Sequence, residues 1–205
     1  MFPNPATGRQ SPRSRLTAIA LVVVGAVVLS TATVLGLHWA SVHGATASPR
    51  TVPAMRQAQG LGFTKLDRQA PAVLLPSLAG SGTVSIAKLA GKPIVVNFWA
   101  STCEVCKSET PALASVARTL KDKITFVGID SVDRHGPATA FITKYHVPYP
   151  IGFDPQGTAA TKYGVIALPV TFFLSRSGKT IMGENIGALT PGTLRTILHN
   201  LYGTT

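Results

Sequence analysis

One uncharged stretch near the amino terminus limits what this 205-residue chain can be. Residues 16–37 contain 16 Ala, Val, Ile or Leu, with four Ser or Thr and two Gly. A helix of this length rises about 33 Å, enough to cross the roughly 30 Å hydrocarbon core of a bilayer. A helix that is apolar on every side needs a large protein to bury it, and this chain is small. The stretch therefore predicts a single transmembrane helix, and it argues against both a wholly soluble chain and a protein with several spans.

The charges around this stretch predict its orientation. Arg9, Arg13 and Arg15 precede it and no basic residue follows it immediately, which favours a cytoplasmic amino terminus. We therefore expect a cytoplasmic segment at 1–15, an anchor at 16–38, a linker at 39–70 and a folded domain at 71–205. The protein would be a single-pass protein of the cell membrane with its domain outside the cytoplasm.

A cleaved signal peptide is the alternative to an anchor. Ala45-Thr46-Ala47 has the small-x-small pattern of a cleavage site. The apolar region of a cleaved signal is typically only about 7–15 residues long, which favours an anchor that is not cleaved. Both interpretations place the remainder of the chain on the extracytoplasmic side.

The positive charge of the domain does not indicate a nucleic-acid-binding protein. Without the three arginines before the apolar stretch, the chain has 16 Lys and Arg and all 8 Asp and Glu, which gives a net charge of +8. These basic residues are scattered, and no basic stripe alternates with aromatic residues. A solvated basic surface is the simpler explanation, and we expect no nucleic-acid partner.

Strand-like and helix-like segments alternate through the domain, which predicts an α/β fold with a central mixed β-sheet flanked by helices. Near-continuous apolar runs, typical of strands buried on both faces, occur at 94–99, 124–129 and 170–174. Two hairpins are expected, one joining 73–75 to 83–86 and one turning at Ser177-Gly178. Helical patterns cover 103–120, 137–145 and 158–163, and a last helix begins at Thr190 and Pro191.

The two cysteines of the chain, Cys103 and Cys106, form a C-x-x-C pair directly after the apolar run at 94–99. A structural zinc site needs two more ligands at matched spacing, and no second C-x-x-C or H-x-x-x-H is present. A structural disulfide closing so short a loop would add little stability. Residues three apart on a helix lie about 5–6 Å apart on one face, close enough for a disulfide. A redox-active pair in an oxidising compartment fits best.

The chemistry of thiol exchange assigns roles within the pair. The attacking group is a thiolate, so the nucleophile needs a lowered pKa and access to solvent. Cys103 lies at a helix N-terminus, which favours negative charge, whereas Cys106 lies one turn further in and suits the resolving role. Glu104 and Val105 separate the two cysteines, and the Glu104 carboxylate would oppose thiolate formation at Cys103. Trp99 could shield the site, although a Trp at a strand end is at least as often part of the core.

The segment 99–111, Trp-Ala-Ser-Thr-Cys-Glu-Val-Cys-Lys-Ser-Glu-Thr-Pro, resembles the active-site segment of the TlpA/ResA-like branch of the thioredoxin superfamily. Segments 91–100, 154–165 and 169–173 agree with the same family in the same order, so that the resemblance covers about residues 71–203. It implies a membrane-anchored thiol-disulfide oxidoreductase with a thioredoxin-like fold. It also implies no cofactor or metal beyond the Cys103–Cys106 disulfide.

The resemblance gives meaning to residues that are ambiguous alone. Pro169 matches the family's cis-proline beside the cysteines, and Leu168 would then offer its backbone to a bound peptide. Glu109 matches an acidic residue thought to assist proton transfer, and Pro111 matches a proline that kinks the helix. Without the family, Pro169 is a proline at a strand start and Glu109 an exposed carboxylate paired with a lysine.

The sequence also departs from the family's pattern. Thr102 stands where many relatives have Trp, which removes an aromatic ring from the rim of the site and leaves the substrate preference open. Ala72-Val73-Leu74 lacks a usual Phe, and Ser175 replaces a common acidic residue. These last two differences concern packing.

We expect the protein to reduce protein disulfides, such as those of apocytochrome c before haem attachment, with electrons from a membrane thiol-disulfide reductase. An oxidase or isomerase of exported proteins is the alternative on the same scaffold, because direction depends on reduction potential and partners. A copper chaperone using the two cysteines with His135 or His146 is less favoured, since the ligand spacing is missing. A thiol peroxidase is weaker still, because position 100 is Ala where its cysteine motif carries Thr.

Overall fold

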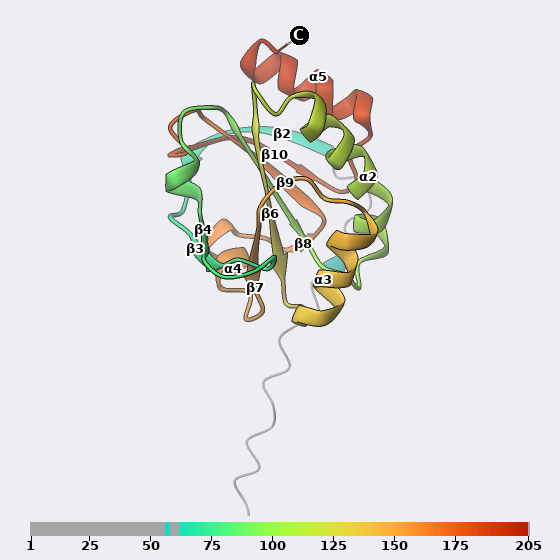
Figure 1. Ribbon diagram of the computed structural model, residues 1–205. Coiled ribbons are helices and arrows are strands. Elements are labelled where there is room, and N and C mark those ends of the chain that lie inside the picture. Colours follow the sequence, from blue (N-terminus) through green and yellow to red (C-terminus); the bar gives the residue numbers. More distant parts are fainter. Residues whose placement is uncertain (1–55, 58–61, 205) are drawn as a thin grey trace, which may run out of the picture. The chain divides into compact units, whose positions relative to one another are not determined.

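Six strands form one mixed sheet at the centre of the domain (Figure 1). The computed structural model describes residues 56–57 and 62–204. The strand order is β2-β10-β9-β5-β6-β7, in which β5, β6 and β7 run parallel and the other neighbours pair antiparallel. This confirms the predicted mixed sheet. The bounds are β2 Gly62–Gln69, β5 Ile94–Trp99, β6 Thr125–Ser131, β7 Ile151–Asp154, β9 Val170–Leu174 and β10 Thr180–Ile186.

The burial of these strands follows their sequences. All six residues of β5 and all five of β9 are buried, as their continuous apolar runs predict. Strand β10 alternates buried and half-buried residues, which is the pattern of a strand with one face toward the core. Strand β6 extends two residues beyond the apolar run and ends on the buried polar residues Asp130 and Ser131.

Four helices and a short hairpin complete the domain, close to the predicted positions. The hairpin consists of β3 (Leu74–Pro76) and β4 (Thr83–Ser85), and a 3-10 helix follows at Ile86–Leu89. The last helix has the predicted cap, since the Thr190 hydroxyl accepts the Thr193 N–H at 3.1 Å and Pro191 is the first helical residue. The helices are α2 Glu104–Thr119, α3 His135–Lys144, α4 Thr158–Tyr163 and α5 Pro191–Tyr202.

The core divides into two clusters, one on each face of the sheet. Helices α2 and α5 pack on one face, where Leu113 and Leu198 meet Val95 and Phe173 of the sheet. The hairpin and α4 cover the other face, where Tyr163 packs against Phe98 and Phe172. In Figure 1, the hairpin and α4 lie on the opposite side of the sheet from α2 and α5. Strand β5 contributes side chains to both clusters and is therefore held from both sides.

The fold begins earlier in the chain than the sequence pattern suggested. Residues 62–69, which we placed in the linker, form β2 at the edge of the central sheet, paired with β10. The prediction that the domain starts at residue 71 is wrong in this respect. No β2 residue is fully buried, and the strand lacks the apolar run that marks the others. Residues 62–69 form a strand because they pair with β10, and side-chain hydrogen bonds also hold them in place. One example is the Arg68 guanidinium, which donates to the Tyr163 carbonyl at 2.8 Å.

A second pairing involves the predicted linker. Strand β1 (Arg56–Gln57) runs parallel to β8 (Ala167–Leu168), with Arg56 opposite Ala167 and Gln57 opposite Leu168. Strand β8 ends directly before Pro169, so a short extended segment of the chain lies along the backbone at the predicted peptide-binding position.

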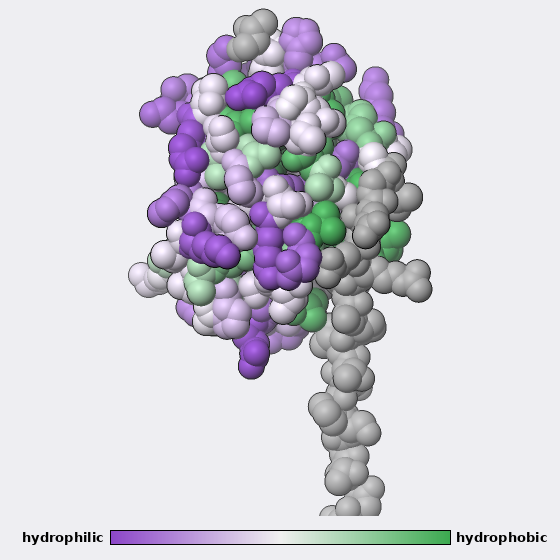
Figure 2. Space-filling model, turned by 90° about the vertical axis from the view of Figure 1, so that its right-hand side faces the viewer, coloured by the Kyte–Doolittle hydropathy of each residue, from purple (hydrophilic) through white to green (hydrophobic). Residues whose placement is uncertain are grey.

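The predicted anchor at 16–38, and the cytoplasmic segment before it, lie outside the described residues. Within residues 56–57 and 62–204, no helix is long and apolar enough to cross a membrane. On the face shown in Figure 2, hydrophilic residues are spread widely and apolar residues form small separate patches.

We expect Gly183→Ala to destabilise the domain, because the Phe63 ring of the neighbouring edge strand β2 packs directly over Gly183 of β10. A Cβ atom there would come within 2.6 Å of the Phe63 ring and 3.1 Å of the Thr64 carbonyl oxygen. Forcing Phe63 aside should lower the free energy of unfolding by about 1–2 kcal/mol. Urea denaturation measures this change. Gly192→Ala in α5 is the matched control, because the nearest atom is 3.9 Å away and alanine favours a helix. Equal stability of the two variants would contradict a close β2–β10 packing.

Candidate active site

The C-x-x-C pair lies at the point where strand β5 gives way to helix α2. Residues 100–103 form the connection, and the Cys103 N–H donates to the Ala100 carbonyl at 3.1 Å. Cys103 is the N-cap of the 16-residue helix α2, and its sulfur accepts the Cys106 N–H at 3.1 Å. The two cysteines form a disulfide with their Cα atoms 5.2 Å apart. The disulfide that the spacing allows is therefore present.

Burial of the two sulfurs differs slightly from the expectation. Cys106 is fully buried, as predicted for a resolving cysteine. Cys103, which we expected to be exposed, is only 3% exposed in the disulfide form. It packs within the larger of the two hydrophobic clusters.

The rim of the site is formed by the residues between and beside the cysteines. Glu104 has a 73% exposed side chain, Val105 is half-buried and Thr102 is exposed. The Glu104 carboxylate forms an ion pair with Lys107 one turn further on. Because Lys107 balances its charge, Glu104 opposes a Cys103 thiolate less than the sequence alone suggests.

The peptide bond between Leu168 and Pro169 is cis, as the family resemblance implies. Strand β9 pairs antiparallel with β5 so that Val170 lies opposite Phe98. One residue further along, Pro169 comes level with Trp99, where the chain leaves the sheet toward Cys103. Leu168 is buried, with 3% of the residue exposed, and its backbone pairs with that of Gln57. The neighbouring Ile166 is 71% exposed and provides an apolar surface beside this backbone.

Glu109 is buried beneath the pair rather than exposed. It is 1% exposed, one turn after Cys106 on α2. Its Oε1 accepts the Asn97 side-chain N–H at 2.8 Å, and its Oε2 accepts the Leu189 backbone N–H at 3.1 Å. Burial raises the pKa of Glu109 to about 8, although both hydrogen bonds act in the opposite direction. The interpretation as an exposed carboxylate paired with a lysine is wrong, and the group holds a proton at neutral pH.

Trp99 belongs to the core. It is 3% exposed, and its ring stacks on Phe141 of α3 with centroids 4.4 Å apart. The packing interpretation of this residue is confirmed, whereas a direct contact with substrate stays a prediction. By stacking on α3, Trp99 fixes the end of β5 from which the active-site loop departs.

Several polar residues near the pair were not identified from the sequence. Asn97 lies in the middle of an apolar run and connects Glu109 to the Thr171 hydroxyl, which accepts its second N–H at 3.1 Å. Asp130 is wholly buried at the end of β6, and Asp133 accepts the Ser101 N–H from the active-site loop. A polar residue inside an apolar, buried strand could have indicated these positions in the sequence, because a buried amide or carboxyl group requires hydrogen-bond partners.

The histidines of the copper alternative lie apart from this arrangement. His135 begins α3 and packs edge-on against Phe153, and His146 follows the end of the same helix. In the part of the chain that the structure describes, no three His, Cys, Asp or Glu side chains are grouped so that they could hold a metal ion.

Comparison with known proteins places the chain among thiol-disulfide oxidoreductases. A family model described as the AhpC/TSA family matches residues 66–181. The thiol:disulfide interchange protein DsbE of Pseudomonas fluorescens biotype C is 34% identical over 120 residues, covering 58% of this chain and 65% of that protein. The thiol-disulfide oxidoreductase ResA of Bacillus thuringiensis subsp. konkukian is 27% identical over 125 residues, covering 58% of this chain and 72% of that protein.

A solved structure supports the same relationship. The secreted Mycobacterium tuberculosis disulfide oxidoreductase homologous to Escherichia coli DsbE is 27% identical to this chain, with a TM-score of 0.57. The match covers 62% of this chain and 95% of that structure. The thioredoxin-like fold and the resemblance to TlpA/ResA-like oxidoreductases are confirmed.

The buried acid predicts a pH-dependent stability that Glu109→Gln removes. Folded Glu109 keeps its proton up to about pH 8, whereas the unfolded chain loses it above about pH 4.5. The folded state binds more protons between these values, so its stability falls as pH rises, by about 1.4 kcal/mol per pH unit. The difference in unfolding free energy between wild type and Glu109→Gln, both oxidised, should therefore decline from pH 5 to pH 8. Parallel curves would show that Glu109 ionises normally.

Proposed function

The chain belongs to the AhpC/TSA family and is a thiol-disulfide oxidoreductase of thioredoxin-like fold, and we propose that it reduces disulfide bonds of other proteins outside the cytoplasm. The proposed substrate class is exported protein disulfides, such as those of apocytochrome c before haem attachment. The observation that carries the proposal is the place of the Cys103 sulfur, at the start of α2 and within hydrogen-bond distance of the Cys106 N–H.

The exchange proceeds in two displacements at sulfur. In the reduced protein, the Cys103 thiolate attacks one sulfur of the substrate disulfide, and the other substrate sulfur leaves as a thiolate that takes a proton. The Cys106 thiolate then attacks the Cys103 sulfur and releases the second substrate thiol. Two electrons pass from the pair to the substrate, which leaves the Cys103–Cys106 disulfide that the structure contains.

The surroundings of Cys103 support the reducing direction. A strongly stabilised thiolate makes a pair oxidising, because it stabilises the reduced form. The helix N-terminus stabilises the Cys103 thiolate, but burial at 3% exposure disfavours the same charge. Lys107, the cation nearest in sequence, is engaged by Glu104. Because these effects oppose each other, the thiolate is stabilised only weakly, which favours a reductant.

Glu109 provides a proton next to this chemistry. A neutral carboxyl one turn below Cys106 can release a proton to, or take one from, a thiol as the disulfide opens and closes. Its pKa of about 8 lies close to the working pH, where such an exchange is efficient. Asn97 and the Leu189 N–H hold the carboxyl in place and stabilise its ionised form.

The strand before the cis-proline supports binding of an extended peptide. Recognition by strand addition uses backbone hydrogen bonds along an exposed edge. Strand β8 pairs with the extended segment Arg56–Gln57, which shows that its backbone can hold such a strand and that a substrate peptide would take the place of this segment. Exposed Ile166 would contact an apolar side chain of the substrate, and Glu104 and Val105 would contact the residues around its disulfide.

We further propose that the domain is tethered to the cell membrane by residues 16–38. A membrane thiol-disulfide reductase would then return the pair to the dithiol form from the same side of the bilayer. The length and charge pattern of the apolar stretch support this placement.

The division of roles predicts different behaviour of the two cysteine variants. Cys106→Ser should accumulate a mixed disulfide between Cys103 and substrate, because the resolving thiol is missing. Cys103→Ser should form no such adduct, and its exchange rate should fall to the uncatalysed value. Non-reducing electrophoresis with mass spectrometry detects the adducts. Adducts formed mainly by Cys103→Ser would reverse the roles.

The reduction potential tests the direction. We expect a value at or below about −230 mV for the Cys103–Cys106 pair, near the reducing end of the thioredoxin superfamily. Equilibration of the protein with dithiothreitol or glutathione buffers, followed by thiol trapping, measures it. A value near −120 mV would instead indicate an oxidase of exported proteins.

A further inference from the structure

Asp130 is a buried acid whose carboxyl group lacks hydrogen-bond donors. It lies at the end of β6, is 0% exposed, and is the register partner of Trp99 on β5. Neither of its oxygens accepts a hydrogen bond from any described residue. An ionised carboxylate in such surroundings is strongly disfavoured, so the group is neutral unless a partner supplies compensation.

The acid that acts on Asp130 is Asp133, three residues further along the chain. Asp130 is the register partner of Trp99, and Asp133 binds the backbone two residues after Trp99. Asp133 binds the active-site loop, residues 100–103, because its Oδ2 accepts the N–H of Ser101, two residues before Cys103. Its Oδ1 accepts the Arg134 N–H at 2.7 Å. Two backbone donors of this kind stabilise a negative charge, so Asp133 is the ionised member of the two.

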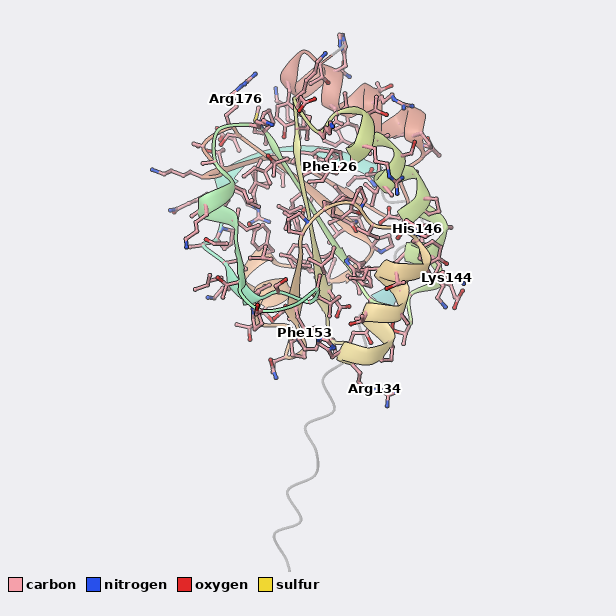
Figure 3. All side chains as sticks on the ribbon, viewed as in Figure 1. Phe126, Arg134, Lys144, His146, Phe153 and Arg176 are labelled. Atoms are coloured by element: carbon pink, nitrogen blue, oxygen red, sulfur yellow. A yellow bond between two sulfur atoms is a disulfide. The ribbon has the colours of Figure 1, made fainter. Side chains whose placement is uncertain are left out.

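The other charged groups around Asp130 do not neutralise it. Asp154 on β7 adds negative charge, and its Oδ2 is occupied by the Ala160 N–H at 3.0 Å and the Ser131 hydroxyl at 3.4 Å. The Arg134 side chain at the start of α3 is exposed and points away from the domain (Figure 3). The exposed His135 packs on Phe153, and the charged residues Glu104 and Lys107 at the start of α2 pair with each other.

The backbone between the two acids is strained. Val132 has a φ of +57°, in the left-handed region that a β-branched residue rarely adopts. Its N–H donates to the Asp154 carbonyl at 3.0 Å, which holds the turn in place. The turn brings Asp133 back over the end of β6 and onto the Ser101 N–H. Strain of this kind persists where the surrounding structure enforces it, commonly next to functional sites.

We propose that Asp130 and Asp133 hold one proton between them, with Asp130 as donor and Asp133 as acceptor, and that this pair positions the loop carrying Cys103. Neither residue touches the sulfurs, so both are positioning residues. The pair has a net charge of −1 while the proton is present. At alkaline pH the proton passes to hydroxide in solvent, two like charges then face each other, and the loop contact at Ser101 is weakened. No electron is transferred in this step.

The ionisation behaviour of Asp130 agrees with this arrangement. Burial, followed by the charge and hydrogen bonding of Asp133 and the charge of Asp154, raises the pKa of Asp130 to about 9. A neutral Asp130 at pH 7 therefore follows from its surroundings. Two carboxyl groups in close contact generally hold a single proton, because both cannot ionise at low cost.

Carbon NMR of the oxidised wild-type protein with 13Cγ-labelled aspartate tests the shared proton directly. One of the five aspartate signals should keep the chemical shift of a protonated carboxyl at pH 7 and should titrate well above that pH. This signal should disappear in Asp130→Asn. In Asp133→Asn it should titrate at least one pH unit lower, because the facing negative charge is gone. Asp122→Asn, which removes an exposed carboxylate, is the matched control and should leave the signal in place.

The proposal is overturned if all five aspartate signals of the wild-type protein titrate below pH 5. This test uses the wild-type protein alone, so it does not depend on whether a variant folds. It is also overturned if Asp133→Asn leaves the high titration where it was. These outcomes do not depend on catalysis, so they are distinguishable from a failure of the proposed oxidoreductase function, on which only the kinetic test below rests.

The positioning role is tested by exchange kinetics. Asn at position 130 can donate an N–H to Asp133 at every pH and so keeps the donor that Asp130 loses. The ratio of the Asp130→Asn rate constant to the wild-type rate constant, for reduction of a peptide disulfide, should rise at least threefold between pH 7 and pH 10. The ratio for Asp122→Asn should stay constant. A constant ratio for Asp130→Asn would show that the pair does not act on the loop.

Discussion

The burial of strand β5 on both of its faces is the constraint on which the active site depends. Its neighbours β6 and β9 hold its backbone by hydrogen bonds, and clusters of apolar side chains hold it above and below. The strand ends at Trp99, which stacks on Phe141, and four residues later Cys103 begins helix α2. A two-residue offset of this strand would move Asn97 away from Glu109 and the loop away from the cis-proline. The position of the sulfurs is thus a consequence of sheet packing more than of the loop itself.

Two buried carboxyl groups flank the same strand end, and each is maintained by a different set of contacts. Glu109 has two hydrogen-bond donors and a pKa of about 8, whereas Asp130 has no donor and faces Asp133. Each group therefore retains a proton at neutral pH because burial outweighs its contacts. Thiol-disulfide exchange moves protons as well as electrons, and Glu109, one turn after Cys106, is a proton source that does not depend on water reaching the buried cysteines. Asp130 instead acts through the loop that carries Cys103.

Local patterns in the sequence predicted much of this arrangement, and non-local contacts account for what they missed. The buried strands, the helix after Cys103 and the cap at Thr190 follow from apolar runs, spacing and turn residues over a few positions. The cis-proline was expected only through the family resemblance. Strand β2 is mostly exposed, so its place depends on β10, more than a hundred residues away. The burial of Glu109 likewise depends on Leu189, 80 residues further on, which no helical pattern around position 109 reveals.

The direction of electron flow depends on how strongly the surroundings of Cys103 stabilise its thiolate. The N-terminus of α2 and the Cys106 N–H stabilise a thiolate, which would make the pair more oxidising. Burial of the sulfur acts against this, and Asp133 places a negative charge on the loop two residues away. Lys107 cannot compensate fully, because Glu104 already engages it. Since the helix terminus and the Cys106 N–H favour the charge while burial and the Asp133 carboxylate oppose it, the thiolate is stabilised only weakly. A pair with a weakly stabilised thiolate donates electrons readily, which is the property that a reductase requires.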